Sequence, residues 1–357
     1  MDENEDVLVS VDGPADAGVG LLTLNRPHAI NSLTHPMVRR ISAALRDWEH
    51  DDTVRAVLIS GAGDRGLCAG GDVVAIYHSA KAGGADARQF WAEEYLLNAY
   101  IGRYPKPYVA VMDGITMGGG VGISAHGSVR VVTETTKMAM PEVGIGFVPD
   151  VGGTYILSRT PGLLGIHVAL TGAPFTGADA IAMGFADHYV PQERLGAFTD
   201  AILADDIGAA VAAYAEEPPL SPLLAEREWI DDCYAGQTAS DIVAALRVHD
   251  AGPGRTGGTA AGKAADLIAS RSPVSVSVTL EAVRRAASLP TLEDVLRQEF
   301  RTSCGALHSH DLVEGIRAQL IDKDRNPQWS PASLSAVTAE DVDGYFVCAD
   351  PDLTIPT

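Results

Sequence analysis

The stretch GITMGGGVGISAHG, residues 114–127, decides how this sequence is interpreted. It lies between two apolar runs, YVAVM (108–112) and VRVV (129–132), which are typical of buried strands. Three consecutive glycines stand where the first run has ended and a helix-like segment begins. Glycine has no Cβ, so it lets the backbone approach a ligand closely or adopt positive φ. The stretch therefore predicts a ligand site at a turn between a strand and a helix.

The composition is that of a large globular protein with an acidic balance of charge. The chain has 357 residues, 46% of them hydrophobic, and a formal net charge of -21. That charge disfavours nucleic acid and anionic membranes as partners, since both need clusters of basic residues. The opening MDENEDV lacks the features of a secretory signal, and no apolar run reaches membrane-spanning length. The four cysteines lack the spacing of a zinc site or a disulfide framework, so we expect reduced thiols and a cytoplasmic location.

Strand-like and helix-like segments alternate in the first half of the chain. Strands are predicted at 19–25, 54–60, 108–112 and 129–132, and helices near 36–50, 88–103, 118–127 and 163–171. Such alternation is typical of an α/β fold. Beyond it the patterns are helical, so we expect an α/β domain over 1–190 and a helical C-terminal region over 191–357. A glycine-rich loop is predicted at 251–262.

Other chemistry is suggested by shorter patterns in the glycine stretches, but these fit poorly. GAGDRG (61–66) and GVGISA (120–125) match a dinucleotide fingerprint. The first does not open a helix directly, and the second has its acid, Glu134, closer than the usual separation of about 20 residues. GISAH (122–126) is similar to a nucleophile elbow, except that His126 replaces its last glycine. We therefore predict that Ser124 is an ordinary helix residue, and that His126 is packed or reaches solvent instead of acting as a base.

Both glycine stretches follow a strand and precede a helix, so each can present a backbone N–H group that no helical carbonyl accepts. Two such groups that converge on one point form an oxyanion hole. GLCAGGD (66–72) followed by GITMGGGVG (114–122) resembles the crotonase, or enoyl-CoA hydratase/isomerase, superfamily. Members of that superfamily polarise an acyl-CoA thioester carbonyl between two backbone amides. By position in the motifs, the resemblance assigns these amides to Gly71 and Gly119.

Further motifs resemble one branch of that superfamily, the 3-hydroxyisobutyryl-CoA hydrolases. They are MAMPEVGIGFVPDVGGTYILSR (138–159), SPVSVSVTL (272–280), EFRTS (299–303), HDLVEGIRAQLIDKD (310–324) and PQWSP (327–331). The resemblance extends from LNRP (24–27) to the region of Phe346. It implies a crotonase-type spiral of β-β-α repeats, with an acyl-CoA-binding catalytic domain in 1–190. It also implies hydrolysis of a short branched 3-hydroxyacyl-CoA, as in valine breakdown, no metal or redox cofactor, and association as a trimer or a dimer.

The resemblance assigns the central chemistry to Glu142. A hydratase of the superfamily uses two glutamates, and the first of them corresponds to Gly122 here, which disfavours hydration because one acid/base carboxylate is missing. Glu142 is expected either to attack the thioester or to act as general base on water. Asp150, eight residues further on, is expected to orient water or the substrate hydroxyl. The alternative for Asp150 is the N-cap of the helix that starts in VGGTYILS.

Substrate binding is assigned by the resemblance to four further residues. Glu94 is expected to meet the 3-hydroxyl group, with a solvated helix face beside Glu93 as the alternative. Ala69, Gly70 and Arg26 are expected to contact CoA, and an ordinary surface role is the alternative for Arg26. Two other functions stay open: an enoyl-CoA hydratase or isomerase, and a protein that binds CoA esters without catalysis.

Overall fold

The computed structural model describes residues 5–252 and 258–356, and the chain forms two compact units. The first unit combines Met1–Asp72, Glu93–Met138 and Phe175–Pro222. The second combines Val73–Ala92, Ala139–Pro174 and Leu223–Thr357. Each unit is therefore built from three separated stretches of sequence, because the chain leaves and re-enters both of them.

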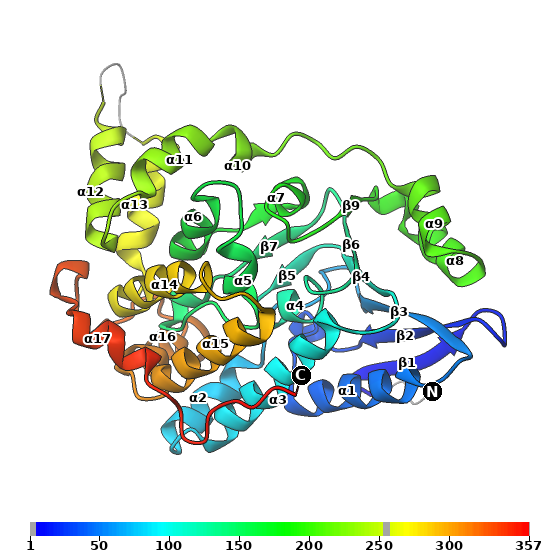
Figure 1. The fold of residues 1–357 in the computed structure, drawn as a ribbon. Helices are drawn as coiled ribbons and strands as arrows, with labels where there is room; N and C mark the ends of the chain where they lie inside the picture. The colour runs from blue at the N-terminus through cyan, green and yellow to red at the C-terminus, as the bar shows by residue number, and fades with distance from the viewer. Residues whose placement is uncertain (1–4, 253–257, 357) are drawn as a thin grey trace. The chain divides into compact units, whose positions relative to one another are not determined.

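A six-stranded sheet forms the centre of the first unit, in the order β1-β2-β3-β4-β6-β9 (Figure 1). Its strands are β1 (Val7–Asp12), β2 (Gly18–Leu24), β3 (Val54–Gly61), β4 (Tyr108–Met112), β6 (Val129–Val132) and β9 (His188–Tyr189). β1 is antiparallel to β2, and each later pair of neighbours is parallel, as expected where longer connections join the strands. A second sheet has the order β5 (Ile115–Met117), β7 (Lys137–Ala139), β8 (Phe175–Thr176).

Helix α1 (His35–Glu49) covers one face of the large sheet. Thr34 caps its first turn by accepting a hydrogen bond from the Met37 amide at 3.4 Å. Apolar residues at helical spacing, the last of which is Trp48, form its buried face. The Trp48 ring lies against β2 at Gly20, where a Cβ would come within 2.6 Å of the ring. The glycine in the middle of β2 is thus explained by the ring that packs on it.

The opposite face of the sheet packs against α8 (Leu195–Ala204) and α9 (Ile207–Tyr214), and Figure 1 shows this helix pair and α1 on opposite sides of the strands. Successive side chains of a strand alternate between the two faces, so Val19 points to α8 and α9 whereas Gly20 faces α1. The buried core on this side combines strand and helix residues: Val19, Ala56, Leu58, Val109, Val111, Val131, Phe198, Ile202 and Ile207.

Helices make up almost all of the regular structure in the second unit, and α14 (Pro273–Ala286) lies at their centre. It contacts α5 (Gly153–Leu157), α6 (Leu164–Thr171), α12 (Ala239–Asp250), α15 (Leu292–Ala306) and α17 (Ala339–Asp343). Ser272 caps α14 by accepting from the Ser275 amide at 3.1 Å. Most α14 side chains are buried, as expected for a helix packed on several sides. Further helices here are α2 (Val73–Lys81), α10 (Pro222–Ala225, from Leu223 on), α11 (Arg227–Tyr234), α13 (Ala260–Ser270) and α16 (His310–Ile316).

The structure contains the elements predicted from the strongest sequence patterns. β4 and β6 have the predicted bounds, and β2, β3, α1 and α6 differ from prediction by one residue at one or both ends. α3 (Ala85–Gly102), which begins in the second unit and continues into the first, matches the helix predicted near 88–103. The helix predicted at 118–127 is limited to α4 (Gly119–Gly122), because a glycine-rich backbone has low helix propensity. Strands β1, β5, β7, β8 and β9 go beyond the prediction.

The chain beyond β9 is helical, as predicted, and the described residues there contain no further named strand. The division into domains at residue 190 stays a prediction. Part of the predicted loop at 251–262, residues 253–257, lies outside the described residues, and α13 already begins at Ala260. In the described parts of the chain, no helix is both long and apolar enough to cross a membrane.

Candidate active site

The two glycine stretches singled out in the sequence lie side by side in the first unit. The Cys68 amide donates to the Ile115 carbonyl at 3.1 Å, and the Met117 amide donates to the Cys68 carbonyl at 2.9 Å. The segment around Cys68 therefore runs along β5, which leads directly into the glycine run. Leu33 holds the same segment from another side, since its carbonyl accepts from the Asp72 amide at 2.8 Å.

At two positions of the run, the backbone conformation or the close packing explains why the residue is glycine. Gly118, just before α4, has a φ of +46°, a region that side chains rarely adopt. At Gly119 a Cβ would lie 2.8 Å from Glu94 Oε1 and 3.3 Å from the Gly71 nitrogen. Only glycine at position 119 therefore lets the second loop approach both the first loop and the Glu94 carboxyl group.

The amides of Gly71 and Gly119 are available to a ligand. Gly119 is the first residue of α4, so no helical carbonyl accepts its N–H group. Neither amide donates a hydrogen bond to another residue in the part of the chain that the structure describes. The Gly71 nitrogen lies 3.3 Å from the Cβ position of Gly119, so the two residues are adjacent. Neighbouring amide donors of this kind can stabilise one oxyanion.

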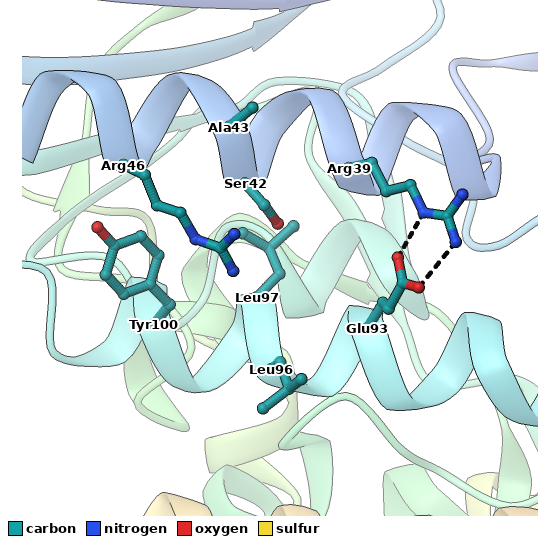
Figure 2. Close-up of a pocket in the computed structure, with 8 residues that line it drawn as sticks. All are labelled: Arg39, Ser42, Ala43, Arg46, Glu93, Leu96, Leu97 and Tyr100. Atoms are coloured by element: carbon teal, nitrogen blue, oxygen red, sulfur yellow. Dashed lines mark hydrogen bonds and ion pairs between the residues drawn. The ribbon is translucent and has the colours of Figure 1, made fainter. Parts of the chain in front are cut away.

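Glu94 is buried beside these amides. Its residue is 2% exposed, and Oε1 is the atom closest to the Cβ position of Gly119. The preceding residue, Glu93, instead accepts hydrogen bonds from Arg39 at 2.6 and 2.8 Å in a groove of about 270 Å³ between α1 and α3 (Figure 2). A solvated helix face, the alternative for Glu94, is therefore wrong.

The residues predicted to contact CoA belong to the same part of the first unit. The Ala69 amide donates to a backbone carbonyl at 2.9 Å, and Gly70 has a φ of +113°. Arg26 donates to the Ser32 carbonyl at 2.6 Å and lies 3.7 Å from the Asp72 carboxylate. Its guanidinium thus supports the first glycine loop. Contact with CoA stays a prediction for Ala69, Gly70 and Arg26.

Two other side chains near the glycine loops are unsuited to nucleophilic attack. Cys68 is buried, and burial raises the pKa of its thiol to about 12, so the thiolate is scarce at neutral pH. Ser124 is also buried, and its hydroxyl donates to the Gly120 carbonyl at 2.6 Å. Ser124 is predicted to be a helix residue, but α4 ends at Gly122, so Ser124 lies just beyond the helix.

The carboxylates predicted from the downstream motif lie in the second unit. Glu142 opens the short 3-10 helix η2 (Glu142–Ile145) and is 6% exposed. Its carbonyl accepts from the Phe147 amide at 3.0 Å, whereas its side-chain Oε2 has no hydrogen-bond partner among the described residues. Burial raises the pKa of Glu142 well above its ordinary value, and the charges of Asp150 and Glu299 raise it further. Such a group is typical of catalytic acids and bases.

Asp150 is 5% exposed and precedes two residues with left-handed backbone. φ is +54° at Val151 and +78° at Gly152, and a β-branched residue such as valine rarely adopts this region. Helix α5 starts at Gly153 with Gly152 as its N-cap, so Asp150 is not the N-cap residue. Because Asp150 acts on the pKa of Glu142, the structure places these two predicted residues in one electrostatic neighbourhood.

A third buried carboxyl group, that of Glu299 in α15, belongs to the same neighbourhood and is absent from the predicted set. It is fully buried and accepts hydrogen bonds from the Gly152 amide at 2.6 Å, the Thr154 amide at 2.9 Å and the Thr154 hydroxyl at 2.6 Å. Its sequence signal is its position four residues after Val295 and three after Leu296, on the buried face of the helix. A carboxyl group is rare on such a face unless it is paired.

The sequence matches the profile of the enoyl-CoA hydratase/isomerase family over residues 19–346. The chain belongs to this family. The mitochondrial 3-hydroxyisobutyryl-CoA hydrolase of Danio rerio is 40% identical over 93% of this chain and 87% of that protein. The protein of the same name from Homo sapiens is 40% identical over 97% of this chain and 89% of that protein. The family resemblance drawn from the motifs is confirmed.

Solved structures of enoyl-CoA hydratase/isomerase family members share the fold. The crystal structure of a carnitinyl-CoA dehydratase from Mycobacterium thermoresistibile has a TM-score of 0.93 at 68% identity and covers 98% of this chain and 99% of that one. An enoyl-CoA hydratase from Rhodobacter sphaeroides has a TM-score of 0.89 at 38% identity, with 98% and 100% coverage. The predicted crotonase-type fold with a helical C-terminal region is therefore confirmed.

In this family member the predicted site residues form two sets. The first unit brings together the loop residues and one acid: Gly71, Gly119, Glu94, Ala69, Gly70 and Arg26. The second unit brings together Glu142 and Asp150, to which the structure adds Glu299. Each set is defined by contacts within its own unit.

Proposed function

We propose that the chain hydrolyses a short branched 3-hydroxyacyl-CoA thioester, with 3-hydroxyisobutyryl-CoA as the preferred substrate. The observation that carries the proposal is the buried Glu142 carboxyl group. Its Oε2 has no hydrogen-bond partner among the described residues, and the charge of Asp150 raises its pKa. The names of the relatives at 40% identity support the same activity. The products are the free acid and CoA.

In the proposed reaction, the amides of Gly71 and Gly119 bind the thioester oxygen and stabilise the negative charge that develops on it. The Glu142 carboxylate then has two routes to the same products. As a nucleophile it bonds to the carbonyl carbon, the CoA thiolate leaves, and water opens the resulting anhydride. As a general base it takes a proton from water, whose oxygen bonds to that carbon while the C–S bond breaks and the CoA thiolate leaves. Both routes need Glu142 in its ionised form.

We assign Asp150 to orienting the attacking water and Glu94 to the 3-hydroxyl group of the substrate. Both are buried carboxyl groups, and a carboxylate accepts strong hydrogen bonds from O–H donors. Ala69, Gly70 and Arg26 are proposed to contact CoA. These assignments rest on the family resemblance, and the burial of Glu94 and Asp150 supports them.

Hydration of an enoyl-CoA is the alternative function, and the names of the two structural neighbours favour it. The family resemblance implies two carboxylates for that reaction. Gly122 takes the place of the first of them and is buried at the end of α4, where it contributes no side chain. Hydrolysis needs a single carboxylate with an oxyanion hole, so the residues of this chain suit hydrolysis better.

The test compares thiol release from 3-hydroxyisobutyryl-CoA with hydration of crotonyl-CoA for the wild type and for Glu142→Gln. We expect thiol release by the wild type, a loss of about 10³-fold in Glu142→Gln, and negligible hydration. Efficient hydration without thiol release would establish the alternative. Binding of the CoA ester without either reaction would indicate a protein that binds without catalysis.

Self-association as a trimer or a dimer is proposed from the family resemblance, and light scattering of the purified protein tests it. A cytoplasmic location is also kept as a proposal. Cys68, Cys233, Cys304 and Cys348 are all free thiols, which suits a reducing compartment. The vertebrate relatives are named as mitochondrial proteins, so fractionation of the source cells decides this point.

A further inference from the structure

Hydrogen bonds in the second unit join two segments that are far apart in the sequence, and one of these segments follows Asp150. Glu299 of α15 accepts three hydrogen bonds from Gly152 and Thr154, which it follows by 147 and 145 residues. Helices α15 and α5 contact each other (Figure 1). We infer that Glu299 is a positioning residue, which holds the segment 150–154 in the conformation that presents Asp150 for the reaction. This inference rests on the proposed function.

The segment needs such support because its backbone is unfavourable by itself. Val151 and Gly152 are left-handed in succession, and Val151 is 1% exposed. The Gly153 amide donates to the Asp150 carbonyl at 2.7 Å, so Asp150 forms one end of the turn. A β-branched residue persists at positive φ only where its surroundings fix it. The hydrogen bonds from Gly152 and Thr154 to one buried carboxyl group provide that constraint.

The arrangement of donors requires a carboxyl group and excludes its amide. The Gly152 N–H group meets Oε2, while the N–H and hydroxyl groups of Thr154 meet Oε1. Glutamine has nearly the same size but only one acceptor oxygen. If that oxygen faces Thr154, its NH₂ group faces the Gly152 N–H, and two donors oppose each other. Aspartate keeps both acceptors but is shorter by one methylene group.

Glu299 also acts on the reaction through charge. Burial and the charge of Asp150 raise the pKa of Glu299, while its hydrogen bonds from Thr154 and Gly152 lower it. The charged groups that act on Glu142 are Asp150 and Glu299. The three donors on its two oxygens match the ionised form of Glu299, and in that form its charge raises the pKa of Glu142. If Glu142 reacts as a carboxylate, Glu299→Gln removes that charge and lowers the pKa of Glu142. The acid limb of kcat/KM then moves to lower pH, which a purely structural role would not produce.

The kinetic experiment uses the full chain with 3-hydroxyisobutyryl-CoA and the variants Glu299→Gln, Glu299→Asp, Thr154→Val and Thr154→Ser. We expect kcat to fall about 10²-fold in Glu299→Gln with little change in KM, since misplacement of a reacting group costs about this much. The kcat values of Glu299→Asp and Thr154→Val should lie between those of Glu299→Gln and the wild type. The kcat of Thr154→Ser should be close to that of the wild type. The control is Glu293→Gln, on the same helix and partly exposed, which should match the wild type.

A second measurement reports whether the segment 150–154 is held in place, and it does not depend on enzyme activity. Amide hydrogen exchange of the peptide that covers residues 150–158 should be faster in Glu299→Gln than in the wild type and Glu293→Gln. The inference would be overturned, and the proposed function kept, if a folded Glu299→Gln protein had the kcat, pH profile and exchange rate of the wild type while Glu142→Gln was inactive. No thiol release by the wild type would remove the proposed function and the kinetic role, while exchange would still decide whether Glu299 holds the segment. Should Glu299→Gln fail to fold, Thr154→Val and Glu299→Asp decide by the same criteria.

Discussion

The amides of Gly71 and Gly119 in the first unit are fixed by neighbouring backbone, whereas the Asp150 segment in the second unit depends on a side chain from a distant helix. The segment around Cys68 and strand β5 exchange backbone hydrogen bonds, so the glycine loops hold each other. The segment after Asp150 is left-handed and is held by Glu299, which follows Gly152 by 147 residues. In the first region, main-chain hydrogen bonds fix the positions of the amide donors. In the second region, side-chain contacts fix the positions of the carboxyl groups.

The difference explains how each region tolerates change. Backbone amides carry no charge, so their usefulness depends on close approach, and glycine at position 119 makes that approach possible. The buried carboxyl groups raise one another's pKa, so their usefulness depends on how many of them are charged. Steric variants therefore test the first region, and charge variants test the second.

The largest effect among the remaining variants is expected for Gly119→Ala. Its Cβ would come within 2.8 Å of Glu94 Oε1 and 3.3 Å of the Gly71 nitrogen, so the buried Glu94 carboxyl group or the Gly119 backbone has to shift and Gly71 has to give way slightly. Loss of one oxyanion donor costs about 10²- to 10³-fold in kcat. We expect a loss of this size in thiol release, with a circular dichroism spectrum like that of the wild type.

Gly196→Ala provides the matched control. Gly196 lies in α8 with no atom within 4 Å of its Cβ position, and alanine is the better helix former. Activity should be unchanged, and thermal stability should be equal or slightly higher. Equal activity of Gly119→Ala and Gly196→Ala would contradict the oxyanion assignment.

The sequence predicts the first region better than the second, and the reason is the distance over which each is determined. β4 and β6 are short runs of mostly apolar residues with polar residues or proline at their ends, so local pattern is enough to place them. β8 and β9 have two residues each and exist only through pairing with distant strands. The glycine motifs likewise lead directly to Gly71 and Gly119. Glu299 has a role only because α15 packs on α5, which no local pattern reveals.

A smaller effect with a characteristic pH dependence is expected for Asp150→Asn. The reactive form of Glu142 is ionised, and burial together with Asp150 raises its pKa, so wild-type kcat/KM should rise as the pH increases through that pKa. Removing the Asp150 charge lowers the pKa of Glu142 and moves the acid limb of the profile to lower pH. We also expect kcat to fall about 10- to 100-fold, because the attacking water loses a carboxylate that orients it. An acid limb that stays in place or moves to higher pH would show that Asp150 does not act on Glu142 in solution.

The smallest effect is expected for Glu94→Gln, which is compared with Glu93→Gln at the adjacent residue of α3. Glu94 is buried against the glycine loops, whereas Glu93 accepts two hydrogen bonds from Arg39 of α1 (Figure 2). If Glu94 meets the 3-hydroxyl group, Glu94→Gln should lower kcat/KM about 10-fold for 3-hydroxyisobutyryl-CoA, as expected for the loss of a charged hydrogen bond. It should change kcat/KM little for isobutyryl-CoA, which has no hydroxyl group to bind. Glu93→Gln should leave both substrates unaffected, because the charged contacts it loses are with Arg39 and His35 rather than with the glycine loops. Equal losses for both substrates in Glu94→Gln would assign Glu94 to holding Gly119 in place instead of to recognising the hydroxyl group.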